Sequence, residues 1–214
     1  MKIWLPFIVV LFLLLVSCKP RKGEITISGK IEGYHNKPVW VYPATSIYIN
    51  KPYGNALDSA ITNSDGVFNL RILSTADQFF YVFSEDDFLL VETPIAASPN
   101  DSVFLKTSIN NTSRPEFSGS NAEFNQLLFT QRQTIPRKFR SMEVFAKPID
   151  GFQNYVDSVE EVANHKIDSF ALASSNSANI LDILKADTRL YLAFVRYDYL
   201  LKHLNLTQGV QEYF

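Results

Sequence analysis

Cysteine is almost absent from this chain of 214 residues, which contains a single one, Cys18. One cysteine cannot form a disulfide within the chain, and no Cys-x-x-C motif is present. If another reaction consumes Cys18, no thiol is left to act as a nucleophile or as a redox group. Any thiol–disulfide chemistry associated with this chain must therefore come from elsewhere.

The usual signatures of catalysis are missing as well. The sequence has no Gly-rich phosphate loop, no His-Glu-x-x-His and no Gly-x-Ser-x-Gly motif. The histidines His35, His165 and His203 are far apart and lack the spacing of metal ligands. The acidic stretch 85–87 lacks the spaced oxygen ligands of a calcium loop, so a solvated hairpin tip is expected there. We expect no catalytic residue, no metal site and no cofactor.

The chain also lacks an excess of basic charge. It has 20 Lys and Arg against 22 Asp and Glu, which gives a formal net charge of −2. This balance would not recruit nucleic acid, so we expect no nucleic-acid partner. An apolar content of 46% and an aromatic content of 14% indicate a globular protein with a well-filled core.

The N-terminus, in contrast, carries a distinct signal. Met1-Lys2 gives a short positive start, and an apolar run follows over 3–16, which is shorter than the ~20 residues of a membrane-spanning helix. This pattern matches a secretory signal peptide over 1–17. The stretch Leu15-Val16-Ser17-Cys18 resembles the lipobox of bacterial lipoproteins. That resemblance implies cleavage between Ser17 and Cys18 and diacylation of the Cys18 thiol; an ordinary signal peptide or an anchor helix is the alternative.

A lipidated Cys18 would place the chain in the cell envelope. Several acyl chains give stable anchoring, where a single one does not. The tether 18–23 is basic and would sit well near anionic head groups, although a solvated linker explains it equally well. The acidic cluster associated with surface export in Bacteroidota lipoproteins is absent. We expect a chain anchored to the outer membrane and facing the periplasm, with the inner membrane as the alternative.

The region 24–118 has the period of β-strands. Apolar and polar residues alternate within short segments separated by turns. The candidate strands are 25–31, 38–42, 57–62, 67–72, 79–83, 88–91, 103–106 and 114–118. Asp65-Gly66 predicts a hairpin between the third and the fourth of these. Seven or eight such strands predict an antiparallel β-sandwich or open barrel.

The region 119–214 has the period of helices, which makes the predicted fold class α+β. Ser120 and Glu123 have the spacing of a capping box and predict a first helix that begins there. The stretch 136–148 is basic and is expected to be irregular. A second helix is predicted over 150–173 and a third over 178–204.

The predicted third helix is apolar on nearly all sides between Leu190 and Leu201. Its charged residues Arg196, Asp198 and Lys202 argue against a membrane span. A helix with two apolar faces needs two partners, and the preceding helices provide only one. We therefore predict self-association through this helix unless a following domain covers it.

The order of four stretches of the sequence resembles that of a known family. They read ITISGKIEGYHNKPVWVY, DSAITNSDGVFNL, FSGSNAEFNQLL and ADTRLYLAFVRYDYLL, and they follow the lipobox. The order is similar to the N-terminal part of the TlpA-like thioredoxin-fold lipoproteins of Bacteroidota. The resemblance implies a small β domain of unknown function and a helical segment that precede a thioredoxin domain. The WCxxC motif of that domain is absent, so the reductase activity of the family cannot be assigned to any residue of this chain.

Two functions follow as the main hypotheses. The first is a non-catalytic module that orients a thioredoxin-like redox domain or binds its protein client. The second is a stand-alone lipoprotein that binds a peptide or a glycan on aromatic residues, for which the candidates are Trp40, Tyr42, Tyr48 and Tyr53. Such aromatic residues more often fill the core of a sheet. An enzyme whose site has no recognisable motif is a third, weaker hypothesis.

One modification is also suggested by the compartment. Three triplets begin at Asp58, Asp101 and Asp157 and resemble the Asp-Ser-apolar acceptor for O-glycosylation in Bacteroidota. The candidate acceptors are therefore Ser59, Ser102 and Ser158.

Overall fold

The computed structural model describes residues 22–48, 54–84, 94–109, 114–173 and 178–207. Within these residues, eight strands precede four helices. The strands are β1 (Gly23–Glu32), β2 (Pro38–Ala44), β3 (Asp58–Ile61), β4 (Val67–Ser74), β5 (Gln78–Ser84), β6 (Ile95–Ala97), β7 (Ser102–Ser108) and β8 (Glu116–Gly119). The helices are α2 (Ala122–Lys138), α3 (Met142–Phe145), α4 (Ile149–Ala173) and α5 (Ala178–Thr207). The α+β class is confirmed.

The strands form two four-stranded sheets, in the orders β4-β1-β7-β8 and β3-β2-β5-β6. Alternate residues of β1, β4 and β2 point into a shared apolar core, as the alternation in the sequence predicts, whereas β5 is buried on both faces. The core residues come from both sheets, for example Ile25 and Leu70 from the first and Val41 and Phe80 from the second. The two sheets therefore pack face to face as a sandwich.

The connections between the strands differ from the prediction in two places. The turn at Asn63–Gly66 forms, with the Gly66 N–H donating to the Asn63 carbonyl, but its two arms do not pair as a hairpin. Instead β3 pairs with β2 and β4 pairs with β1, so the chain crosses from one sheet to the other at this turn. In addition, β1 and β7 are parallel, whereas every other pairing is antiparallel among the described strands. Alternation of apolar residues does not specify strand direction, which is why the sequence missed this.

The first helix also begins differently from the prediction. Ser120 does not cap it, because the Ser120 hydroxyl accepts the N–H of Ser102 in the neighbouring β7. The N-cap residue is Asn121 in a left-handed conformation with φ 56°, and its side chain donates to the carboxylate of Asp101. The predicted capping box of Ser120 and Glu123 is therefore wrong. The Ser120 hydroxyl accepts a hydrogen bond from β7 and is therefore not used to cap the helix.

The stretch 136–148 is more helical than predicted. Helix α2 continues through Pro136 to Lys138, because the buried side chains of Ile135 and Phe139 hold both flanks of the proline in the core. The proline removes one N–H from the helix, which then ends within three residues. Short helix α3 follows, capped by the Ser141 hydroxyl. Helices α4 and α5 confirm the predicted helices 150–173 and 178–204 to within three residues.

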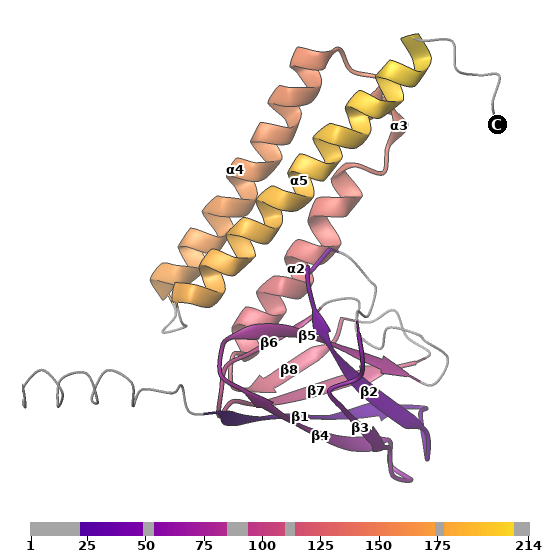
Figure 1. Cartoon of the computed structure of the whole chain (residues 1–214), viewed down its shortest axis with the longest axis vertical. Coiled ribbons are helices and arrows are strands. Elements are labelled where there is room, and N and C mark those ends of the chain that lie inside the picture. Colours follow the sequence, from indigo (N-terminus) through magenta and orange to yellow (C-terminus); the bar gives the residue numbers. More distant parts are fainter. Residues whose placement is uncertain (1–21, 49–53, 85–93, 110–113, 174–177, 208–214) are drawn as a thin grey trace, which may run out of the picture.

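The helices form a bundle that extends from the sandwich along the long axis of the molecule (Figure 1). A second core cluster joins them, and it includes Phe79 and Ala96 of the sheet together with Phe124, Phe152 and Leu192 of the helices. β1 starts at the sandwich end, whereas α5 runs away from it and ends at the far end of the bundle (Figure 1). With 30 residues, α5 is ~45 Å long.

Several predicted features lie outside the described residues. They are the signal peptide and lipobox with Ser17 and Cys18, the strand 88–91, the acidic stretch 85–87, Tyr53, and the end of the chain after residue 207. The strand β6, in contrast, is present and was not predicted, because its three residues are too few to show a period.

Candidate functional site

The contact between the sandwich and the bundle is built from buried polar groups. On α2, the Asn125 side chain is fully buried and bonds both backbone groups of Ala96: its Oδ1 accepts the N–H at 2.7 Å and its Nδ2 donates to the carbonyl at 3.2 Å. Ala96 belongs to the edge strand β6, whose outer side would otherwise expose unpaired groups. The asparagine therefore closes the sheet edge and fixes α2 on it.

A second set of buried polar groups fixes α5 on the segment after β2. The Asp187 carboxylate accepts the Ile47 N–H at 2.7 Å, and the Tyr48 hydroxyl lies 3.0 Å from the Thr188 hydroxyl. The Tyr81 hydroxyl of β5 donates to the Ser46 carbonyl at 2.8 Å. We call Ser46, Ile47, Tyr48, Asp187 and Thr188 the joint. The members of the joint are buried. Removal of one partner of any of these hydrogen bonds would therefore leave the other partner buried and unpaired, which is costly.

The joint shifts the titration of its own groups. Burial raises the pKa of Asp187, and hydrogen bonds from Ile47 and Ser46 offset part of that effect. Burial likewise raises the pKa of Tyr48 and Tyr81 above the usual tyrosine value. These shifts come from enclosure within packed structure, and neither hollow described below reaches Asp187 or the two tyrosines. The joint is thus arranged to hold two parts together rather than to receive a substrate.

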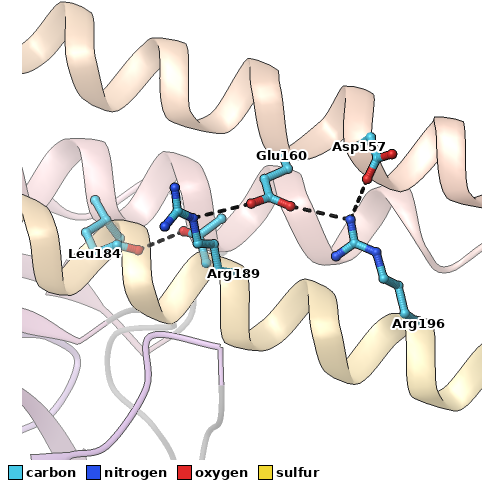
Figure 2. Close-up of polar contacts among 6 residues, drawn as sticks. Asp157, Glu160, Leu184, Arg189 and Arg196 are labelled. Carbon is cyan, nitrogen blue, oxygen red and sulfur yellow. Dashed lines mark hydrogen bonds and ion pairs between the residues drawn. The ribbon is translucent and has the colours of Figure 1, made fainter.

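Helices α4 and α5 are tied by ion pairs that run along the hairpin. Glu160 of α4 lies 3.5 Å from Arg189 and 3.4 Å from Arg196 of α5, and Asp157 lies 2.6 Å from Arg196 (Figure 2). Further along, Lys185 pairs with Asp168 at 2.5 Å. We call these six residues the ladder. Along the ladder, the residue numbers fall on α4 as they rise on α5, because the two helices are antiparallel. The ladder thus sets the register of the hairpin.

The acidic surface of α4 forms an open hollow of about 480 Å³. It is lined by Asp157, Glu160, Glu161, Asn164, His165 and Asp168. Three of the four carboxylates belong to the ladder, so cations of α5 already offset their charge. No group of three or more His, Cys, Asp or Glu among the described residues is arranged to hold a metal ion. The hollow therefore offers little net charge to a cation.

A smaller hollow of about 120 Å³ lies between α2 and α4. Its floor includes Ile135, Val159 and Ala163, and its lining includes the lysines Lys138 and Lys166. The buried Gln131 side chain donates to the Ala163 carbonyl and fastens the two helices there. At this volume the hollow is well below the usual size of a small-molecule pocket, ~300 Å³ or more.

The outer face of α5 is apolar and exposed. Leu190, Phe194, Tyr197 and Leu201 are 66%, 63%, 57% and 39% exposed, respectively. The inner face, with Thr188, Leu192, Val195 and Tyr199, is buried. The sequence therefore correctly predicts a helix with two apolar faces, of which the described part of the chain covers one. We call Leu190, Phe194, Tyr197 and Leu201 the α5 stripe.

The residues singled out in the sequence do not come together in one site. The candidate acceptors Ser59, Ser102 and Ser158 are exposed but lie on β3, β7 and α4, and their glycosylation stays a prediction. The Ser158 hydroxyl donates to the Tyr155 carbonyl within its own helix.

The three histidines likewise stay apart from one another. His35 lies in a loop of the sandwich, His165 lies on α4, and the His203 ring stacks on Tyr199 of α5.

The aromatic candidates divide between the core and the surface. Tyr48 is buried in the joint and belongs to the core. Trp40 and Tyr42 are half-buried on the side of β2 that faces away from the sandwich core. Tyr42 packs edge-on against Phe83. Of the predicted binding face, only Trp40 and Tyr42 stay accessible among the described residues.

Sequence reasoning missed the joint. Its signal is a polar pair, Asp187-Thr188, on the helix face that is otherwise built from Leu184, Leu192 and Val195. A carboxylate on an apolar face implies a specific partner, but the sequence does not say that the partner is the backbone of Ile47, 140 residues away.

Comparisons with known proteins add no family to this description. No family model matches the chain, and no curated protein matches it. Within the described residues, no helix combines the length and the hydropathy that a bilayer crossing requires.

Proposed function

We propose that this chain is a membrane-anchored, periplasm-facing lipoprotein module that orients a thioredoxin-like redox domain or binds its protein client. The observation that supports this most directly is the placement of the first described strand and the last described helix. β1 starts within the sandwich, and α5 ends at the far end of the bundle (Figure 1). An anchor on Cys18 would then lie at one end of the molecule, and a group held by the end of α5 would lie at the other.

The joint and the ladder support this role because both stiffen the body. A module that sets the distance between a membrane and a second domain must not bend at its centre. Buried hydrogen bonds of Asn125 and Asp187 fix the bundle on the sandwich, and the paired charges of Glu160 and Arg196 fix the register of the hairpin. Neither hollow in the described residues combines an enclosed apolar cavity with converging reactive groups.

The anchor is tested by substitution of its acceptor. The full chain, expressed in a bacterium with labelled fatty acid, should incorporate the label and fractionate with membranes. Cys18→Ser should abolish the label and leave an uncleaved or soluble product, whereas Ser59→Ala, which leaves the lipobox intact, should label normally. Label on the Cys18→Ser chain would show that another residue is acylated and would remove the basis of the proposal.

A peptide- or glycan-binding lipoprotein is the second candidate, and the half-buried Trp40 and Tyr42 favour it. If cleavage removes 1–17, Trp40 is the only tryptophan left in the chain, so its fluorescence reports on this face alone. A saturable change of that fluorescence on titration with periplasmic peptides or glycans, lost in Tyr42→Ala, would favour the second candidate over the first.

A further inference from the structure

We propose that the α5 stripe is the contact between two copies of this chain, whose α5 helices lie parallel. The stripe repeats at intervals of four, three and four residues, and its four side chains fall within an arc of about 60° at 3.6 residues per turn. This is the spacing of the seam between two packed helices. The described part of each copy has one helix with such an exposed seam, so a second copy supplies the matching partner.

The charges around the stripe permit this pairing. The stripe itself carries no charge. Ala193 and Leu200, both exposed, flank it on one side, and the partly exposed Asp198 and Lys202, which pair with each other at 2.7 Å, flank it on the other. The cations Arg189 and Arg196 turn toward α4, where Glu160 and Asp157 pair with them (Figure 2). The charges near the stripe thus have partners within their own copy, so two copies can approach along their stripes without burying an unpaired charge.

The exposed area sets the strength of the contact. Taking ~200 Å² for each aromatic side chain, Phe194 and Tyr197 present ~250 Å², and with the leucines the patch is on the order of 500 Å² on one copy. Two facing patches would bury ~1,000 Å², which is at the lower limit for a specific interface. The contact is therefore weak in solution, and confinement of both copies to one membrane raises their effective concentration.

The parallel orientation rests on the proposed function. If both copies are anchored through Cys18 to one leaflet, both sandwich ends face that leaflet and both α5 helices point away from it (Figure 1). A two-fold axis along the helices then places Leu190 opposite Leu190 and Tyr197 opposite Tyr197. An antiparallel pair would instead place Leu190 opposite Leu201.

Single cysteines in the full, membrane-bound chain test this arrangement. Acylation of Cys18 leaves no other thiol, and only residues whose Cα atoms approach within ~7 Å form a disulfide. Leu190→Cys should give a disulfide-linked dimer on mild oxidation. The matched control is Leu172→Cys, which replaces an equally apolar and 91% exposed leucine of α4 outside the stripe and should stay monomeric. The chain with Cys18 alone provides the background.

A charge within the stripe should break the contact. Phe194→Asp in the Leu190→Cys chain should lower the cross-linked fraction about tenfold, because the pair would bury two unpaired carboxylates. Leu172→Asp should leave it unchanged. If Phe194→Asp left the cross-linked fraction of the Leu190→Cys chain unchanged, the proposal would be overturned. So would linkage only between Leu190→Cys and Leu201→Cys chains, or linkage only to other proteins.

The fatty-acid label, measured on the same samples, separates this proposal from the anchor. A label without a cross-link would overturn the pairing and leave the anchor intact. A cross-link without a label would overturn the anchor and leave the pairing in place.

Discussion

Asp187 occupies a position on the inner face of α5 where its neighbours along the helix face are apolar. Its carboxylate accepts the hydrogen bond of the buried Ile47 N–H, so the Ile47 N–H depends on Asp187 for this hydrogen bond. Asp187→Ala leaves the N–H buried and unpaired and should lower the free energy of unfolding by ~1–3 kcal/mol. Asp187→Asn keeps an acceptor oxygen and should cost much less. Urea denaturation of both variants measures the difference, and equal losses would contradict the assigned hydrogen bond.

The same residue gives a pH dependence with a definite sign. Burial raises the pKa of Asp187 in the folded chain above its value in the unfolded chain, so folding favours the protonated carboxyl. That stabilisation is fully present below the unfolded-chain pKa and is lost as the pH rises through the folded-chain pKa. The stability of Asp187→Asn relative to the unsubstituted chain should therefore increase from acid pH to neutral pH. A relative stability that falls over this range would contradict the raised pKa.

Between helices α4 and α5, the ladder predicts that the neighbouring Glu160 and Glu161 contribute unequally to stability. Glu160 contacts two arginines of α5, whereas its neighbour Glu161 has no ion pair with a described residue. Glu160→Ala should cost ~1 kcal/mol of stability, because partly exposed ion pairs contribute little each. Glu161→Ala, the matched control, should be neutral. Thermal denaturation at low and high salt gives the measurement, and the loss in Glu160→Ala should shrink as salt screens the pairs. Equal effects at both positions would show that the ladder contributes nothing.

Two glycines predict opposite effects of the same substitution. A Cβ on Gly29 of β1 would lie 2.5 Å from the Leu105 carbonyl oxygen and 2.7 Å from the Phe68 ring, so Gly29→Ala should destabilise the sandwich by ~1–3 kcal/mol. A Cβ on Gly151 of α4 meets nothing closer than 3.9 Å, and Gly151→Ala should stabilise the chain by ~0.5 kcal/mol. The melting temperatures should move in opposite directions. A tolerated Gly29→Ala would mean that β1, β4 and β7 are packed less closely than described.

What the sequence predicts well at this scale is what depends on local periodicity. The sequence predicts the strands β1 and β4 and the helices α4 and α5 because each buries one regular face. The capping role of Ser120, the pairing of β3 with β2 and the parallel pairing of β1 with β7 were missed, because each depends on partners far away in the sequence. The α5 stripe was anticipated from the excess of apolar residues, whereas the joint at Asp187 was not.

The proposed function gives the whole molecule a mechanical role. A chain that begins at Lys19 contains no cysteine and should not reduce the disulfides of insulin. The assay compares its rate with that of dithiothreitol alone, and a thioredoxin domain provides the positive control. Turnover above the dithiothreitol rate would show that the chain has a reducing site of its own and would contradict a purely positioning role.

The proposed anchor at Cys18 would hold the sandwich near a membrane and the far end of the bundle away from it. Residues 18–23 can span at most ~17 Å, so acylation of Cys18 would keep the start of β1 close to the bilayer. Leu73 pairs with Glu24 at that start, and Met142 lies on α3 near the opposite end; both are exposed.

The distance of each end of the molecule from the membrane is measured by the quenching of a fluorophore by labelled lipid head groups. The fluorophore is attached through Leu73→Cys or Met142→Cys in the full, membrane-bound chain, and the proposed acylation of Cys18 would leave no other thiol to label. We expect strong quenching at position 73 and little at position 142. Equal quenching at both positions, or stronger quenching at position 142, would contradict it.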